Sequence, residues 1–297
     1  MFINLHSMTG LFVGFRSDFN KGRAAAKTLW QMVADEIPSR TDTNNYPFEG
    51  SFPRLREWKG SRFVKNIRTY FYSLQNVEFE ATVEVPRKHI INDQYGVFRP
   101  KMQMMGASAA MHPDELVFGA AAAGATGLCY DDQPFFNGSH PLIVDGVAST
   151  TSNYDSTAVT NLWMLLDCSK PMKPFIYQQR EPYTFVAKTA PNDDNVFWQG
   201  NFVYGCNGYG AGGYGMWQLA YGSLNTLNAT NVDAYATAMK GLKDDEGHPL
   251  YVTPTHLVVG PSNEAAARDL VKKEFLTGGG SNPHFKAYEI VVSPFLT

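Results

Sequence analysis

A glycine cluster is the first segment in which residue type and spacing could indicate chemistry. The sequence GCNGYGAGGYG places Gly208, Gly210 and Gly213 in the G-x-G-x-x-G spacing that lets a backbone approach a pyrophosphate. The same spacing recurs at Gly210, Gly212 and Gly215, as a glycine-rich composition produces by itself. The strand-like MWQLAYG follows, whereas a dinucleotide site needs a helix whose N-terminus faces the pyrophosphate. We therefore expect a flexible or tightly bent β-connection here.

Adjacent acidic residues form three runs that could hold a metal or supply an acid–base pair. The runs are Asp131–Asp132, Asp193–Asp194 and Asp244–Glu246. None has the alternating ligand spacing of a calcium loop, and side chains adjacent on a chain rarely converge on one atom. Each run also adjoins a turn signal such as Pro134 or Gly247. We therefore expect solvated turns in all three places.

The histidines and cysteines show no catalytic or zinc signature. His112 and His140 lie in no H-E-x-x-H, G-x-S-x-G or Cys–His motif, so we expect both to have structural roles. Cys129, Cys168 and Cys206 are odd in number and lack C-x-x-C spacing, which supports neither a disulfide framework nor a zinc ribbon. We expect buried free thiols in a reducing compartment. The residues thus predict no enzyme, no metal and no cofactor.

Composition indicates a folded chain whose surface is partly covered. The 297 residues carry 25 Lys and Arg against 28 Asp and Glu, a net charge of −3, which excludes a generally basic nucleic-acid coat. Hydrophobic residues reach 44%, so we expect one large or two smaller ordered domains. Charged residues reach only 18%, where about 25% is usual. No stretch approaches the ~20 apolar residues that cross a membrane.

A run of basic residues, here called the basic stripe, is the most unusual charge feature. Its members, with Glu57 as the local acid, are Arg54, Arg56, Lys59, Arg62, Lys65 and Arg68. Three interpretations remain open: a solvated hairpin face, docking onto an acidic neighbouring subunit, or phosphate contact in which Trp58, Tyr70 and Phe71 stack on bases. The acidic balance of the whole chain disfavours phosphate contact.

The basic stripe lies in a segment that predicts an extended β-ribbon. Between residues 41 and 85, aromatic residues stand among Gly and Pro, and TYFYSLQNVEFEATVEV alternates in hydrophobicity. Such a ribbon cannot form its own core, so it must lie across the same chain or a neighbour. Before it, residues 11–37 predict one or two short helices of an arm that Pro38 ends.

One long helix is predicted after the ribbon, over residues 101–127. Its apolar stripe comprises Met102, Met105, Ala109, Leu116 and Ala120. We expect a kink or a restart at His112–Pro113, because proline removes a backbone donor. Asp114 would suit the first turn of a restarted helix, where acids are favoured.

The rest of the chain predicts a β-rich mixture with two further helices. Residues 129–155 are polar and predict a loop. Strands are expected at 161–168, 173–179, 182–188, 195–205, 214–222, 255–260 and 288–296. The helices are expected at 232–243, capped by Asn231, and at 263–275. The fold class is therefore α+β.

Long segments spread along the chain carry a family resemblance. In order, they are YPFEGSFPRLREWKGSR, YSLQNVEFEATVEVPR, DQYGVFRPKMQMMGASAAMHPDELVF, CYDDQPFFNGSHP, LLDCSKPMKPFIYQQR, NVFWQGNFVYGCNGYGAGGYGMWQLAYGS and GHPLYVTPTHLVVGPSNEAAA. Together they resemble the major head subunit of bacteriophage Mu and its prophage relatives. The resemblance runs from about Leu11 to the C-terminus and is far more specific than any motif considered above.

The resemblance implies the Hong Kong 97 type of tailed-phage capsid fold. Its expected parts are an N-terminal arm at 1–40, an E-loop hairpin region at 41–85, a spine helix with a peripheral (P) domain at 86–230, and mainly an axial (A) domain at 231–297. The strands between Trp163 and Tyr221 would lie mainly in the P domain. The E-loop would cross the adjacent subunit, with Phe48, Phe52 and Trp58 as buried anchors and the basic stripe fixing orientation.

The implied function is structural. Many copies would form hexamers and pentamers of an icosahedral virion head around double-stranded DNA, without catalysis, cofactor, membrane or sequence-specific DNA contact. Partners would include a scaffold or protease, a portal and decoration proteins, with assembly in the bacterial host cytoplasm. One alternative is a nanocompartment shell of the same fold, which would enclose protein. The other is a cytosolic hydrolase, which would need a pocket lined by His140 and Asp131.

Overall fold

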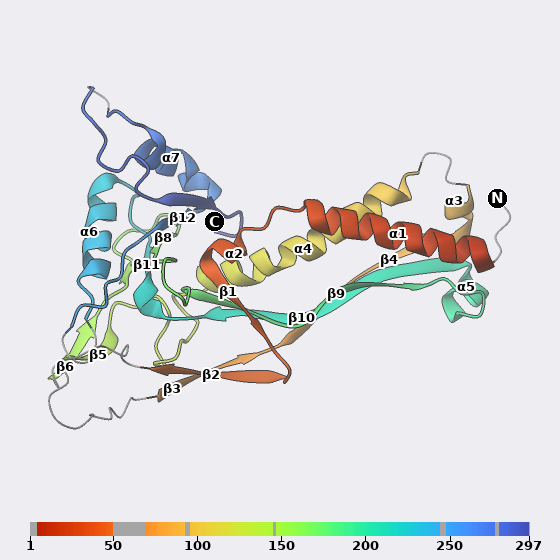
Figure 1. Cartoon of the computed structure of the whole chain (residues 1–297), viewed down its shortest axis with the longest axis horizontal. Helices are drawn as coiled ribbons and strands as arrows, with labels where there is room; N and C mark the ends of the chain where they lie inside the picture. Colours follow the sequence, from red (N-terminus) through yellow and green to blue (C-terminus); the bar gives the residue numbers. More distant parts are fainter. Residues whose placement is uncertain are drawn as a thin grey trace, which may run out of the picture.

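The computed structural model describes residues 5–49, 69–92, 96–144, 147–243, 248–276 and 279–296. The molecule is elongated (Figure 1). Two helices lie along a long sheet, and a second sheet with two flanking helices forms one end, here called the compact end. A two-stranded ribbon lies beneath the long sheet, on the side away from the two helices.

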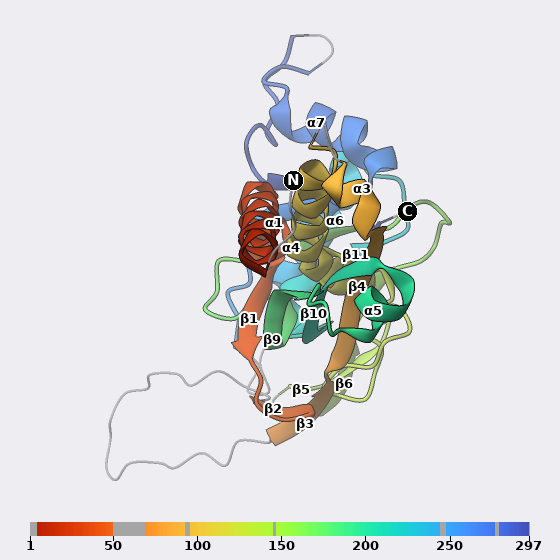
Figure 2. The same cartoon turned by 90° about the vertical axis from the view of Figure 1, so that its right-hand side faces the viewer.

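Two long helices form the layer above the long sheet. They are α1 (Leu5–Ala25) and α4 (Phe98–Ala122), and they lie side by side in both views (Figures 1 and 2). A Cβ atom at Gly22 or Gly106 would lie 1.9 or 2.0 Å from a carbonyl oxygen of the other helix. Because real Cβ atoms do not approach so closely, glycine at these two positions lets the helix backbones touch.

Two buried carboxylates tie the N-terminal segment to α4. Asp18 in α1 accepts a hydrogen bond from Nε of Arg99 at 3.0 Å. Asp114 accepts hydrogen bonds from the backbone N–H of Leu29 at 2.9 Å and of the first residue of α2 (Trp30–Val33) at 2.7 Å. A side chain of α4 therefore satisfies the otherwise unpaired donors at the start of α2.

The long sheet has the strand order β1–β9–β10–β4. β1 (Ala34–Pro38) is parallel to β9 (Phe175–Lys188), and β10 (Asn201–Tyr214) is antiparallel to β9 and to β4 (Val77–Pro86). All of the glycine cluster except Gly215 lies within β10, so the expected bent connection is wrong. A Cβ at Gly212 would lie 2.2 Å from a carbonyl oxygen of α4, so glycine here lets the helix pack directly on the strand.

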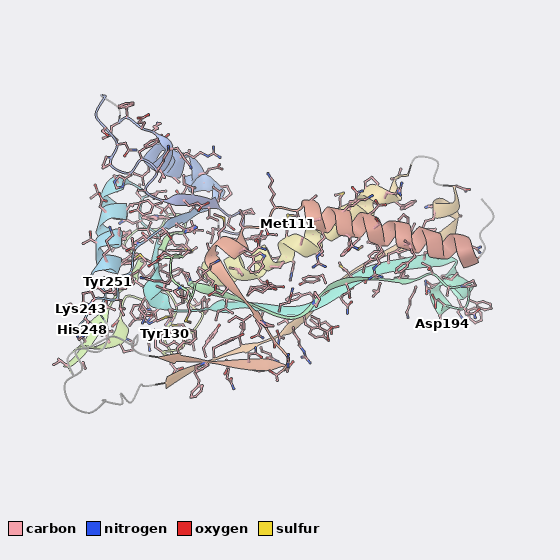
Figure 3. The ribbon with its side chains drawn as sticks, viewed as in Figure 1. Met111, Tyr130, Asp194, Lys243, His248 and Tyr251 are labelled. Atoms are coloured by element: carbon pink, nitrogen blue, oxygen red, sulfur yellow. The ribbon has the colours of Figure 1, made fainter. Side chains whose placement is uncertain are left out.

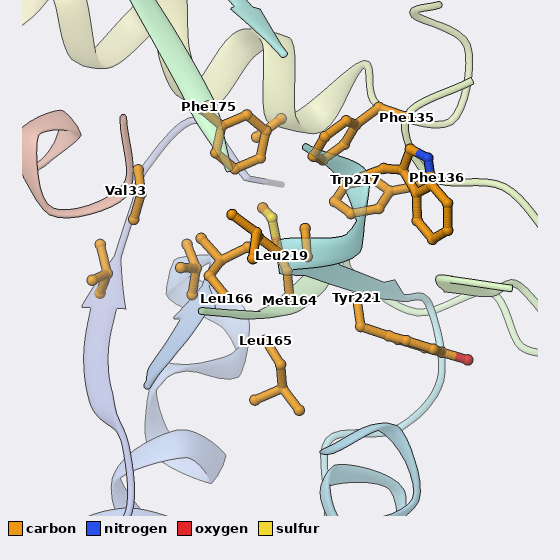
Figure 4. Close-up of a cluster of buried hydrophobic side chains, with 14 of the residues drawn as sticks. Val33, Phe135, Phe136, Met164, Leu165, Leu166, Phe175, Trp217, Leu219 and Tyr221 are labelled. Carbon is orange, nitrogen blue, oxygen red and sulfur yellow. The ribbon is translucent and has the colours of Figure 1, made fainter. Parts of the chain in front are cut away.

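The compact end is built on a sheet of order β13–β12–β8–β11–β7. Its strands are β7 (Tyr154–Asp155), β8 (Trp163–Leu166), β11 (Ala220–Ser223), β12 (His256–Val259) and β13 (Glu289–Val292). It is flanked by α6 (Ala229–Lys240) and α7 (Glu264–Lys272), and the 3-10 turns η1 (Trp217–Leu219) and η2 (Pro261–Asn263) precede β11 and α7. The central strands β8 and β11 are wholly buried, β12 is nearly so, and their side chains contribute to the core in Figure 4.

Four smaller elements complete the described structure. They are the ribbon of β2 (Thr43–Glu49) and β3 (Thr69–Gln75), the hairpin of β5 (His140–Val144) and β6 (Val147–Thr151), and the short helices α3 (Arg87–Ile91) and α5 (Asp194–Gln199). Among the described residues, no helix is both long and apolar enough to cross a membrane.

The helices differ from expectation at two places. The arm holds two helices, as expected, but the first, α1, is 21 residues long rather than short. Apolar residues such as Phe19 bury against α4 and the long sheet and stabilise α1 along its length. The expected restart at His112–Pro113 is wrong, since α4 continues through Pro113. Packing on α1 and the sheet outweighs the one backbone hydrogen bond that proline removes, and Asp114 caps α2 instead.

The strands differ from expectation as well. Residues 77–86 leave the ribbon and join the long sheet as β4, because β10 offers them a full antiparallel partner. Residues 194–199 form α5 before β10 begins, and Gly200 with φ +67° ends that helix. The expected loop at 129–155 contains the β5–β6 hairpin. Asn228, not Asn231, caps α6.

The strands between Trp163 and Tyr221 divide between the two sheets. β9 and β10 belong to the long sheet, whereas β8 and β11 pair with each other and with β12 in the compact end. The assignment of these strands mainly to a P domain stays a prediction. Since pairing partners are far apart in sequence, hydrophobic alternation within each strand carried no information about them.

Candidate assembly surfaces

The ribbon of β2 and β3 lies against its own chain. Tyr46 Oη donates a hydrogen bond to Gln178 at 2.6 Å, and Tyr72 Oη accepts one from the backbone N–H of Tyr214 at 3.3 Å. Phe48 is only 3% exposed. Its ring stacks on Tyr130 with centroids 4.8 Å apart and planes at 22°. Phe48 is therefore a core residue of its own subunit. We no longer expect it to be an anchor that contacts a neighbouring subunit.

We predict that Phe48→Ala destabilises the isolated subunit. Truncating a buried phenylalanine typically costs about 3–5 kcal/mol. The free energy of unfolding, measured by urea denaturation of unassembled protein, should fall by that amount. Phe71→Ala on the same ribbon is the control, because the Phe71 side chain is 69% exposed and should change stability little. Equal stability of the two variants would contradict the core assignment.

The remaining predicted contact residues lie outside the described part of the chain. They are Phe52, Arg54, Arg56, Trp58, Lys59, Arg62, Lys65 and Arg68. The described ribbon ends at Glu49 on one strand and resumes at Thr69 on the other. These residues are the chain segment between the two paired ends, and their part in a hairpin stays a prediction.

An open apolar groove lies between α4 and β4, and we call it the methionine groove. It is a cavity of about 580 Å³ whose apolar lining includes Phe79, Val83, Met102, Met104 and Met105. The Met104 side chain is 71% exposed. Methionine side chains are flexible and polarisable, so a groove lined by them adapts to the shape of an inserted side chain.

The inner wall of the methionine groove carries His112. Its Nδ1 lies 2.6 Å from the hydroxyl of Tyr183, and its ring centroid lies 4.3 Å from that of Phe79. Burial lowers the pKa of His112, which favours the neutral imidazole. The wall is thus uncharged. Elsewhere, the charged residues Glu80 and Lys101 line the groove. The sequence had predicted a structural role for His112 but not its place in a groove.

The β4 strand that borders the groove presents acidic side chains, here called the acidic face. Glu78, Glu80 and Glu84 are exposed and alternate along the strand. Their hydrogen-bond partners are neutral: Glu80 accepts from Thr82, and Glu84 accepts from Asn201 at 2.7 Å. A hydrogen bond with Glu78 raises the pKa of Tyr209. Because side chains alternate along a strand, these carboxylates lie on the face of β4 opposite to Phe79 and Val83, which line the groove.

A second exposed apolar surface lies on α5, at the end of the molecule opposite the compact end, near the label of Asp194 in Figure 3. Phe197 and Trp198 are 69% and 77% exposed. Their rings meet edge to face with centroids 4.9 Å apart. Exposed aromatic pairs of this kind are typical of interfaces. Hydrophobic alternation had instead predicted a strand here, with its aromatic residues on sheet faces.

A buried polar cluster replaces the solvated turn expected at Asp131. His140 Nδ1 lies 2.7 Å from Asp131 Oδ2, and Cys129 Sγ lies 2.9 Å from Asp131 Oδ1. The three side chains are at most 5% exposed. Burial raises the pKa of Asp131, but hydrogen bonds from His140 and Cys129 outweigh it and hold the value below its usual range. Burial also raises the pKa of the Cys129 thiol, so it stays protonated.

The other candidate residues give no reactive arrangement either. The hydrolase alternative fails on access, since His140 is 0% exposed and cannot meet a substrate. Burial raises the pKa of Cys168 to about 12 and that of Cys206 above its usual value, so both are protonated at neutral pH, as expected for inert thiols. The run Asp244–Glu246 lies outside the described residues.

Solved structures of phage capsids share this fold. The subunit of the bacteriophage JBD30 procapsid matches with a TM-score of 0.87 at 37% identity, covering 99% of this chain and 100% of that one. The JBD30 capsid matches with a TM-score of 0.81 at 30% identity, covering all of both chains. The fold is therefore the Hong Kong 97 type, and it defines a capsid subunit of tailed phages.

Sequence comparison specifies the family. The chain belongs to the Mu-like prophage major head subunit gpT family, which it matches over residues 8–296. It is 39% identical to the FluMu prophage major head subunit of Haemophilus influenzae, over 91% of this chain and 90% of that protein. It is 36% identical to the major capsid protein of Escherichia phage Mu over the full length of both. The predicted family, fold and non-enzymatic structural role are confirmed.

Proposed function

We propose that this protein assembles in many copies, as hexamers and pentamers, into an icosahedral phage head that encloses double-stranded DNA. The full-length match to head subunits, together with the fold shared with a procapsid subunit, is the observation that carries the proposal. The net charge of −3 suits a shell that encloses DNA without binding it tightly, because many contacts to phosphates would bind the DNA strongly.

Electron microscopy of the purified protein and of lysate from cells expressing it tests this function. Closed shells, tubes or ring-shaped capsomers are expected, and particles from the phage should contain DNA. Particles that enclose protein in place of nucleic acid would overturn the proposal in favour of a nanocompartment. Dispersed monomers that persist when the neighbouring phage genes are co-expressed would also overturn it.

The hairpin residues 50–68 of one subunit are proposed to dock on the methionine groove and acidic face of the next. The donor segment carries aromatic residues beside the basic stripe. The receiving surface is the edge strand β4, with the apolar cavity on one face and the exposed carboxylates on the other, so the donor would wrap around that edge. Phe52 and Trp58 would enter the groove while the stripe meets the acidic face. Each contact is weak alone, but a lattice multiplies it because every subunit meets several neighbours.

We predict that Trp58→Ala leaves the subunit folded but impairs shell formation. Losing a buried aromatic anchor typically costs an interface about 2 kcal/mol or more. Sedimentation should show most of the protein as unassembled subunits or capsomers. Trp58→Phe is the matched control and should assemble, since a ring still fills the groove. If Trp58→Ala sediments as shells like the unchanged protein, Trp58 is not an anchor.

Further proteins are proposed to act in assembly. A JBD30 capsid decorated with minor capsid protein trimers matches this chain with a TM-score of 0.77 at 30% identity, over 92% of each chain. By analogy, we propose decoration proteins for this head, together with a scaffold or protease and a portal, all meeting the subunit in the bacterial host cytoplasm. Co-expression with each neighbouring gene, scored by particle yield and closure, identifies which are required.

A further inference from the structure

The buried cluster of Cys129, Asp131 and His140 contains side-chain atoms of three metal-binding types. The thiol sulfur, a carboxylate oxygen and an imidazole nitrogen all lie within 4.8 Å of one another. The cluster lies between the end of α4 and η1. The imidazole ring of His140 stacks on the ring of Trp217, with centroids 4.1 Å apart and an angle of 7° between the planes. Figure 4 shows Trp217 beside Phe135 and Phe136 in the core, so the ring has a rigid support.

The hydrogen bonds of Asn153 fix which nitrogen of His140 carries a proton. Asn153 Nδ2 donates to the backbone carbonyls of Phe135 at 2.7 Å and of Trp217 at 3.3 Å. Its Oδ1 accepts from the backbone N–H of Asn137 at 2.9 Å, so the amide orientation is determined. His140 Nε2 lies 3.1 Å from that same oxygen and must therefore donate a proton to it.

A neutral His140 in this tautomer would turn a lone pair toward a carboxylate. Its Nδ1 lies 2.7 Å from Asp131 Oδ2, and both atoms would be hydrogen-bond acceptors. Two acceptors cannot face each other in a buried site unless a positive species lies between or beside them. A second proton on His140 satisfies this requirement, and so does a metal ion.

We propose that this cluster is a site for a zinc ion, with Cys129 Sγ, Asp131 and His140 Nδ1 as three ligands of a tetrahedral ion and a water molecule as the fourth. Zinc is bound by this combination of sulfur, nitrogen and oxygen atoms. Asn153 holds the opposite ring nitrogen, as the supporting residue of a metal-bound histidine commonly does. The backbone N–H of Gln133 supports Asp131 at 3.2 Å in the same way.

Zinc would replace the direct hydrogen bonds of the cluster with bonds to the ion, and the thiol proton of Cys129 and any proton on His140 Nδ1 would pass to solvent. With metal–ligand distances of about 2.0–2.3 Å, the two hydrogen-bonded pairs must separate from 2.7 and 2.9 Å to roughly 3.3–3.7 Å, which is less than about 1 Å for each pair. The gain is structural: Cys129 and Asp131 follow α4, while His140 begins β5. The ion would fasten the loop between these elements to the compact end.

Metal analysis of the assembled or unassembled protein tests the site. After incubation with ZnCl₂ and extensive dialysis, about one zinc per chain is expected by mass spectrometry of the metal content. Replacement by Co²⁺ should give the absorption of a thiolate-bound tetrahedral ion. Both signals should be lost in Cys129→Ser and kept in the matched control Cys206→Ser, since Cys206 lies in β10 outside the cluster.

If a variant fails to fold, the zinc content and the Co²⁺ spectrum of the unchanged protein are enough to test the proposal. Less than about a tenth of a zinc per folded chain, together with Co²⁺ spectra that lack thiolate absorption, would show that a proton alone occupies the cluster and would overturn the site. A chelator should also lower the melting temperature of the zinc-loaded protein and not that of Cys129→Ser. These readouts do not depend on whether shells form, so they are independent of the proposed function.

Discussion

Gly106→Val is expected to be the most damaging single substitution in the helix layer. The added Cβ would lie 2.0 Å from the carbonyl oxygen of Phe19, and backbone cannot rotate away as a side chain can. α1 must therefore move off α4, which disturbs the contact between the buried Asp18 carboxylate and Arg99. We expect a loss of at least about 3 kcal/mol in the free energy of unfolding and no recoverable shells.

Gly119→Val on the same helix is the matched control for this experiment. No atom lies within 4 Å of a Cβ at Gly119, so the substitution changes helix propensity without a clash. Urea denaturation of unassembled protein should show it within about 1 kcal/mol of the unchanged chain. If the two valine variants were equally stable, the direct contact between the α1 and α4 backbones would be excluded.

Local patterns predicted the existence of many elements but not their partners. The long helix, the ribbon at 41–75 and the apolar strand 163–166 follow from periodicities that a sequence displays. The extent of α1 and the continuity of α4 through Pro113 do not, since tertiary packing stabilises both. The place of β4 in the long sheet likewise depends on β10, more than one hundred residues away.

The candidate sites show the same limit. Composition and charge identified the basic stripe, but the surface that could receive it combines β4 with α4, two elements separated by α3. Asp131 was predicted to be solvated because its neighbours signal a turn. It is buried instead, because His140 and Cys129 converge on its two oxygens from the ends of one loop. No spacing rule for catalytic or zinc motifs covers that geometry.

Reversing the basic stripe at Arg54 and Arg56 to Glu is expected to abolish shell assembly at low salt. If the stripe meets the acidic face, two attractive pairs become repulsive, which costs about 1–2 kcal/mol at each subunit contact. Each 1.4 kcal/mol raises the subunit concentration needed for association tenfold. Because the contact repeats throughout the lattice, sedimentation should show subunits or capsomers where the unchanged protein forms shells.

Restoring complementarity distinguishes this docking from a general effect of charge. Glu78→Lys with Glu80→Lys should block assembly alone but rescue the Arg54→Glu, Arg56→Glu variant when all four substitutions are combined. Glu264→Lys with Asp269→Lys on α7 provides the control, since it changes charge equally without touching β4 and should rescue nothing. Assembly of the Arg variant at low salt, or rescue by the α7 control, would contradict the pairing. A rescue that weakens as salt screens the charges would show that the stripe orients neighbouring subunits through electrostatics, while the groove supplies the contact that persists.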